Sequence, residues 1–172
     1  MNLVELIDPM ETVQKQMVDA AWHGMLSAPA NTARDWMDQL CQREPALESY
    51  LFSADEHYSP SDERGIIFLA GFLIWRLLAG EKSKPLTDEA LEKVQEQNVR
   101  HFYELDASSK HVFLEAARKL NAVSNQRPLI EFVLEILRHY FHDAPPAADA
   151  NLRLALVHLK TVVDCLDHHQ GA

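Results

Sequence analysis

Apolar residues recur at intervals of three and four positions along most of this chain of 172 residues. Positions with this spacing lie on one face of an α-helix, and no stretch alternates apolar and polar residues for long enough to suggest a β-strand. Seven or eight helical segments follow one another, separated mostly by breaks of four to eight residues. Breaks this short make neighbouring helices antiparallel. We therefore expect an all-α fold, a compact bundle of helical hairpins that forms a single domain over residues 1–172.

The most apolar segment is GIIFLAGFLIWRLLAG, residues 65–80. Only eleven uncharged residues separate Arg64 from Arg76, whereas a membrane-spanning helix needs about 20 apolar residues. Ser59–Pro60 before the segment and Gly80 after it are typical of the ends of helices in water. The apolar residues extend right round the helix, and such a helix is enclosed by protein. The pattern argues against a membrane span and predicts a helix near residues 60–79 at the centre of the bundle.

Three residues of this segment carry more specific predictions. Gly65 and Gly71 have no side chain, so we expect them to allow close packing of a neighbouring helix. Arg76 is the only charge in the run, and burying an unpaired charge is costly. We therefore expect Arg76 either to pair with a carboxylate or to reach solvent near the end of the helix.

Capping residues mark two other helix starts. Asp8–Glu11 combines an acidic cap, a proline and a glutamate in the order that favours the start of a first helix. Thr87 can cap a later helix, and Leu86 and Leu91 have the spacing of a hydrophobic staple around it. The polar Asn98 interrupts the apolar stripe of the same helix, so we expect its inward face to be imperfect.

The net charge of −10 is concentrated towards the N-terminus, where residues 1–60 carry ten acids and three bases. Binding to nucleic acid requires clustered Lys and Arg side chains. No such cluster occurs, since the densest basic spot is EKSK at residues 81–84. The same lack argues against docking on an anionic membrane surface. We therefore expect neither nucleic acid nor a membrane as partner.

The chain also lacks the usual sequence marks of export and of catalysis. Cys41 and Cys165 make neither a disulfide framework nor a CxxC pair. The first ten residues, MNLVELIDPM, have no positively charged region and no small-residue cleavage site, so a cytoplasmic location is expected. No nucleophile elbow, glycine-rich phosphate loop or dinucleotide fingerprint occurs, which argues against the enzyme classes that depend on them.

The most site-like segment is PLIEFVLEILRHYFHD, residues 128–143. Glu135, His139 and His142 are residue types that bind divalent transition metals when they converge. However, Glu135, Arg138 and His142 share a narrow arc of an otherwise apolar helix, which is most simply its solvent-facing edge. The spacing also differs from the Glu-x-x-His of di-iron bundles, because Arg138 takes the histidine position. The three residues are candidate metal ligands only if this edge faces another helix with ligands.

The last helix, within residues 148–172, carries a heptad-like seam. Its apolar residues are spaced four, three, four and three, as Leu152, Leu156, Leu159, Val163 and Leu166. One interpretation is packing on the domain's own core, and the alternative is a seam for self-association or for a protein partner. Two heptads are too few to predict a coiled coil.

These observations favour a non-enzymatic cytoplasmic interaction module with no cofactor, which forms a homodimer or binds another protein. A second hypothesis is a metal-dependent helical enzyme that uses the Glu/His cluster on the 128–142 helix with a divalent transition metal. A third is a small-molecule sensor with an aromatic pocket near Trp22, Trp36 and Trp75, although aromatic residues at helical spacing also suit a core.

Overall fold

The computed structural model describes residues 13–59, 63–79, 84–108, 112–141 and 149–169. These residues form eight α-helices and no β-strand. In chain order they are α1 (Lys15–Leu26), α2 (Ala30–Arg43), α3 (Pro45–Tyr58), α4 (Ile66–Leu78), α5 (Asp88–Ser108), α6 (Val112–Ala122), α7 (Arg127–Phe141) and α8 (Asp149–His169). The predicted all-α bundle is confirmed.

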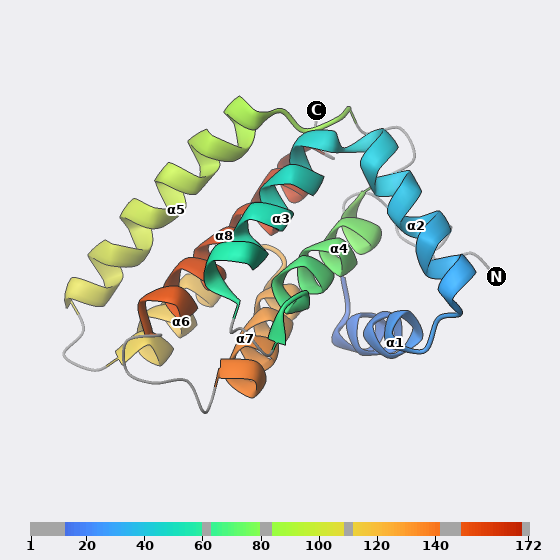
Figure 1. Cartoon of the computed structure of the whole chain (residues 1–172). Helices are drawn as coiled ribbons and strands as arrows, with labels where there is room; N and C mark the ends of the chain where they lie inside the picture. Colours follow the sequence, from blue (N-terminus) through green and yellow to red (C-terminus); the bar gives the residue numbers. More distant parts are fainter. Residues whose placement is uncertain (1–12, 60–62, 80–83, 109–111, 142–148, 170–172) are drawn as a thin grey trace.

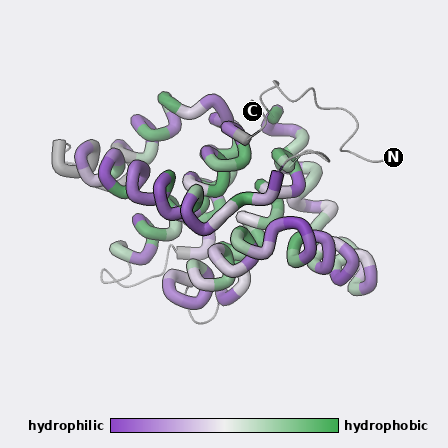
Figure 2. Tube along the Cα trace, turned by 90° about the horizontal axis from the view of Figure 1, so that it is seen from above, coloured by the Kyte–Doolittle hydropathy of each residue, from purple (hydrophilic) through white to green (hydrophobic). Residues whose placement is uncertain are grey.

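Two helices lie at the inside of the bundle. Figure 1 shows α3, α4, α5 and α8 lying roughly along one direction, with α1 and α2 on the side away from α5. Helix α8 packs against α3, α4, α5 and α7, and α4 packs against α1, α3, α7 and α8. Along the tube in Figure 2, hydrophobic and hydrophilic stretches alternate within most helices, as amphipathic helices around a shared core require. The inner pair is therefore α4 and α8.

The prediction of a central apolar helix is confirmed for α4. Ten of its thirteen residues are buried, and Leu69, Arg76 and Leu77 are half-buried. Because its apolar residues cover the whole circumference, α4 is stable only with neighbours on every side. Within the described residues, no helix has the length and apolarity that a membrane crossing would require.

Helix α8 shares this inner position, which the sequence did not single out. Nine consecutive residues, 155–163, are buried. They include three polar side chains, those of His158, Lys160 and Thr161. Because α8 is surrounded by four helices, both its apolar seam and its polar residues lie inside the bundle.

Gly71 allows α3 and α4 to approach closely, as predicted. A Cβ atom at Gly71 would lie only 2.1 Å from Cδ2 of Leu51, so the leucine occupies the space that a side chain would take. The prediction for Gly65 is wrong, because a Cβ atom there would meet nothing within 4 Å. Its φ of 98° instead lies in the left-handed region, which glycine adopts without strain. Gly65 therefore serves the turn into α4.

A side chain from α3 caps the start of α4, whereas the sequence suggested Ser59–Pro60. The carboxylate of Asp55 accepts a hydrogen bond from the Gly65 N–H at 2.7 Å. It also accepts the N–H groups of the first turn of α4, at 3.1 and 3.4 Å, which a helix leaves without partners of its own. Ser59 Oγ donates to the same carboxylate at 2.7 Å, so this serine orients the cap. Residues 60–62 lie outside the described part of the chain.

The predicted cap of α5 is confirmed. Thr87 Oγ1 accepts the backbone N–H of Ala90 at 3.2 Å, and both staple residues, Leu86 and Leu91, are buried. The sequence alone predicts this motif because all its members lie close to the start of the helix. The predicted first helix start at Asp8–Glu11 lies outside the described residues.

Replacing Gly71 by alanine tests the close approach of α3 and α4. The new methyl group would overlap Leu51, so we expect the free energy of unfolding to fall by about 1–3 kcal/mol. Gly24→Ala is the matched control, because Gly24 lies within α1 and a Cβ atom there meets nothing within 4 Å. That variant should gain roughly 0.5–1 kcal/mol. Urea unfolding followed by circular dichroism measures both, and equal effects of the two substitutions would contradict the close packing.

Candidate functional site

The heptad-like seam of α8 lies within the chain's own core. Four of its five residues, Leu156, Leu159, Val163 and Leu166, are buried, and Leu152 is half-buried against the same core. These side chains pack in the region where α8 meets α3, α4, α5 and α7. In this structure the seam therefore packs on the chain itself, the first of its two interpretations.

The candidate metal ligands are exposed on α7 where they are described. Glu135 accepts hydrogen bonds from Lys15 Nζ at 3.1 and 3.3 Å, and this contact with Glu135 raises the pKa of Lys15. His139 is exposed, with its ring edge-on to that of Tyr140. His142 lies outside the described residues. No group of three His, Cys, Asp or Glu side chains with metal-binding geometry occurs among the residues described, so metal binding by this triplet stays a prediction.

The three tryptophans have different neighbours. Trp22 packs edge-on against a phenylalanine of α7, whereas the other two meet arginines between α2 and α4. The guanidinium carbon of Arg76 lies 3.7 Å from the centre of the Trp36 ring, and that of Arg43 lies 5.8 Å from the centre of the Trp75 ring. Burial lowers the pKa of Arg76, and in the described part of the chain this residue has no ion pair. Of the two expectations for Arg76, the carboxylate partner is absent among the described residues, and the half-buried guanidinium near the end of α4 instead makes a cation–π contact with Trp36.

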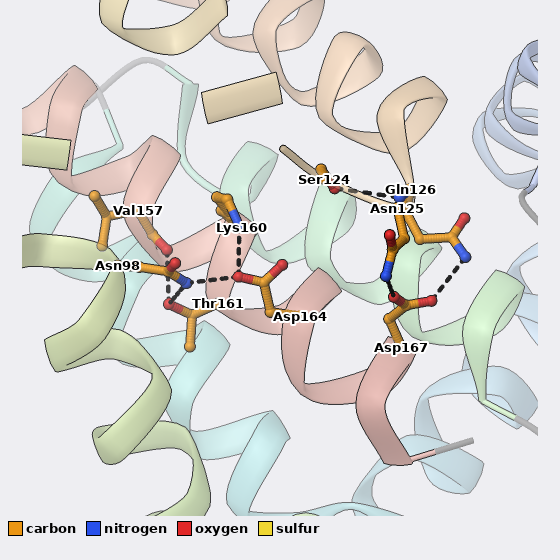
Figure 3. A network of polar contacts seen from close by, with 9 residues as sticks. All are labelled: Asn98, Ser124, Asn125, Gln126, Val157, Lys160, Thr161, Asp164 and Asp167. Carbon is orange, nitrogen blue, oxygen red and sulfur yellow. Dashed lines mark hydrogen bonds and ion pairs between the residues drawn. The ribbon is translucent and has the colours of Figure 1, made fainter. Parts of the chain in front are cut away.

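A buried polar cluster joins α5 to α8 (Figure 3). Asn98 Nδ2 donates to Thr161 Oγ1 at 3.2 Å and to Asp164 Oδ2 at 2.9 Å. Lys160 Nζ donates to the same Asp164 oxygen at 2.6 Å, although the Lys160 side chain is only 7% exposed. The Thr161 hydroxyl donates to the Val157 carbonyl at 2.8 Å. The asparagine that interrupts the apolar stripe of α5 therefore has its partners on α8.

This cluster fixes how α5 lies on α8. A buried lysine and carboxylate are tolerated only when they are paired and hydrogen-bonded, and Lys160 and Asp164 meet this condition within α8 itself. Sliding α5 along α8 would instead leave the buried amide of Asn98 without its partners Thr161 and Asp164. Polar residues within an apolar helix interface can set its register in this way. The sequence showed Asn98 as an interruption but not its partners, because Thr161 and Asp164 lie more than sixty residues away.

A second polar junction, on the right of Figure 3, fastens the turn before α7 to α8. Gln126 Oε1 accepts the Val13 N–H at 3.0 Å, and Gln126 Nε2 donates to Asp167 Oδ1 at 2.8 Å. Asn125 donates to the other Asp167 oxygen at 3.4 Å. One glutamine thus connects the chain before α1, the turn before α7 and the end of α8.

His158 is buried between two tyrosines of α3. The rings of Tyr50 and Tyr58 each have their centres 5.0 Å from that of His158. The Nδ1 atom lies 2.9 Å from the Leu154 carbonyl, which assigns a proton to Nδ1. Burial lowers the pKa of His158, against the opposing effect of that hydrogen bond. The neutral imidazole is therefore the form that fits between α3 and α8.

Two other ionisable groups of this region are held in their neutral forms. Burial raises the pKa of the Tyr50 hydroxyl, which lies beside Thr161 without a hydrogen bond of ordinary geometry. Burial, with a smaller contribution from Asp164, raises the pKa of the Cys165 thiol to about 12. A thiol that stays protonated at neutral pH is a poor nucleophile. The residues around His158 thus suit packing and register rather than covalent catalysis.

The solvent side of α3 carries an aromatic residue. Leu47, Leu51 and Ala54 are buried and define the inner side of this helix. Phe52 lies on the other side and is 61% exposed, with its ring edge-on to that of Phe68 at 5.5 Å. Glu48 and Glu56 are each four residues from Phe52, so the three share one helix face. We refer to Glu48, Phe52 and Glu56 as the α3 outer face.

The spacing of apolar residues in the sequence is enough to place Phe52 on the solvent side of α3. The buried positions 47, 51 and 54 follow helical spacing, which already places Phe52 away from them. Comparison with protein-family models, with curated protein sequences and with solved structures finds no match to this chain.

The buried His158 predicts a loss of stability in acid. Its pKa is lowered in the folded protein, so the unfolded chain takes up a proton first as the pH falls below the ordinary value of 6.5. We expect the free energy of unfolding to be unaffected by this group above that pH and to decrease below it. His158→Phe keeps a ring between the tyrosines and should reduce the decrease. Urea unfolding across this pH range measures the effect.

The control for the pH experiment is His139→Gln, at an exposed histidine of α7. This substitution should leave the pH dependence of stability as it is in the unmodified chain. If His139→Gln removed as much of the acid sensitivity as His158→Phe, the assignment to the buried imidazole would be wrong.

Proposed function

We propose that this chain is a non-enzymatic cytoplasmic helical module that binds another protein through the α3 outer face. The observation that carries the proposal is the exposure of Phe52 in the middle of a helix whose opposite side is buried. Covering the exposed ring with a partner would remove apolar surface from water, which is favourable. Aromatic residues of this kind commonly anchor protein interfaces.

The surroundings of Phe52 support this role. Contacts on its inner side hold α3 in place. Asp55 caps α4, Leu51 packs over Gly71 of α4, and two tyrosines of α3 contact His158 of α8. A rigid helix presents its outer residues without the entropic cost of ordering them on binding. The buried ring of Phe68 lies edge-on to Phe52 at 5.5 Å and supports it from the core side.

Another protein suits this role better than a second copy through the α8 seam. The seam residues are already packed inside the chain, and a dimer through them would require α8 to leave its four neighbours. We therefore expect the isolated protein to have the mass of one chain, 19.6 kDa.

Removal of the Phe52 ring tests the proposed function. The unmodified chain and the variants Phe52→Ser and Val123→Ser are compared for mass in solution and for proteins captured from a cell extract. Val123 is the control, because its side chain is 67% exposed and lies far from α3 in sequence, in the turn after α6. We expect a specific partner that Phe52→Ser loses by at least about tenfold and Val123→Ser retains. Loss of capture in both variants, or in neither, would contradict the proposal.

A further inference from the structure

We propose that the partner reaches the α3 outer face with a basic segment, an amphipathic stretch of another protein in which Lys or Arg residues flank an apolar one. This inference rests on the proposed function and specifies the chemistry of the partner. It follows from the carboxylates on either side of Phe52 and from their lack of ion pairs among the described residues.

The acids of the α3 outer face have no basic partners. Glu48 and Glu56 stand one helical turn before and after Phe52, and Glu56 is exposed whereas Glu48 is half-buried. In the described part of the chain neither carboxylate forms an ion pair. Two uncompensated negative charges thus lie on either side of the exposed ring.

The acidic surface continues onto α2. The Cys41 thiol of α2 lies close to Glu48 of α3, and Asp38 stands one turn before Cys41 on the same helix. Partial desolvation, followed by the negative charges of Glu48 and Asp38, raises the pKa of the Cys41 thiol. Asp38 is exposed and has no ion pair among the described residues. The acidic surface therefore extends from Asp38 of α2 to Glu48, which lies one turn from Phe52.

Several other acids of the described structure have partners within the fold. Asp55 caps α4, and Glu44 accepts the Leu86 N–H at 2.7 Å. Glu135 pairs with a lysine of α1, and Asp164 pairs with a lysine of its own helix. Among the described residues, Glu48 contacts the Cys41 thiol and Glu56 has no ion pair or hydrogen bond, so neither carboxylate is paired with a cation.

An exposed ring with carboxylates one turn away in both directions fits a definite occupant. An apolar side chain of the partner would pack on the exposed ring of Phe52, while cations one turn before and after it would meet Glu56 and Glu48. Apolar contacts at the centre supply most of the affinity of such an interface, and charges at the rim control association rate and partner choice. Nucleic acid and anionic lipid are both repelled by this surface.

Two synthetic helical peptides provide the probe. One is built of Leu and Lys with lysines one turn from a central leucine, and the other replaces each Lys by Glu. Fluorescence anisotropy of the labelled peptides measures binding to the full chain at low and at physiological salt. We expect the Lys peptide to bind, more weakly as salt increases, and the Glu peptide to show no binding.

Matched charge variants locate the binding. The double variant Glu48→Gln/Glu56→Gln should weaken binding of the Lys peptide by about tenfold, and Phe52→Ser should weaken it at least as much. Glu92→Gln/Glu96→Gln removes the same charge from two exposed residues of α5 and should leave the affinity unchanged. Circular dichroism checks that each variant keeps the helical content of the unmodified chain.

Each outcome decides the inference separately from the proposed function. Equal weakening by the α3 and α5 double variants would show general attraction to an acidic protein and would overturn the inference. Binding of the Glu peptide as tight as that of the Lys peptide would also overturn it. If Phe52 governs capture of a protein partner but the Lys peptide does not bind, the proposed function stands and the basic partner is excluded.

Discussion

The structure depends on one constraint, the enclosure of a helix that is apolar on every side. Helix α4 cannot expose a face to water, so α1, α3, α7 and α8 must all pack against it. Helix α3 meets this constraint at two points, through the Asp55 carboxylate on the first amides of α4 and through Leu51 over Gly71. These contacts fix the rotation of α3 about its axis. Phe52 faces solvent because the rest of α3 is committed to α4 and α8.

The polar residues within the bundle serve the same arrangement. Helix α8 is nearly as enclosed as α4, yet it carries a lysine, a histidine and a threonine among its buried residues. Asp164 accepts hydrogen bonds from this lysine and from Asn98 of α5, and two tyrosines of α3 hold His158 between their rings. Apolar contacts could be exchanged for others at a shifted register, whereas these contacts could not. The apolar residues give the bundle its stability, and the polar ones select the register in which it packs.

Patterns that are local in sequence predicted the structure well. The circumference of α4 and the Thr87 cap could be read because helix geometry alone determines them. The Asp55 cap was missed because a nearer candidate, Ser59–Pro60, had the right residue types. The seam of α8 was ambiguous, since the same spacing suits a helix packed on its own core and one packed on a partner. The partners of Asn98 depend on how α5 meets α8, which no local pattern contains. Phe52 could have been placed outside from the spacing of α3.

The central claim is that the chain encloses α4 by itself, which leaves the α3 outer face rather than α4 for a partner. Native-state hydrogen exchange of the isolated protein tests this most directly, because it reports the free energy needed to open each helix. The amides of Ile67 to Leu73 in α4, and those of residues 155–163 in α8, should exchange only by global unfolding. Those of α2, which buries only Leu40, should exchange through smaller openings. Exchange of the α4 amides as fast as those of α2 would show that α4 is not enclosed in the isolated chain and would contradict the claim.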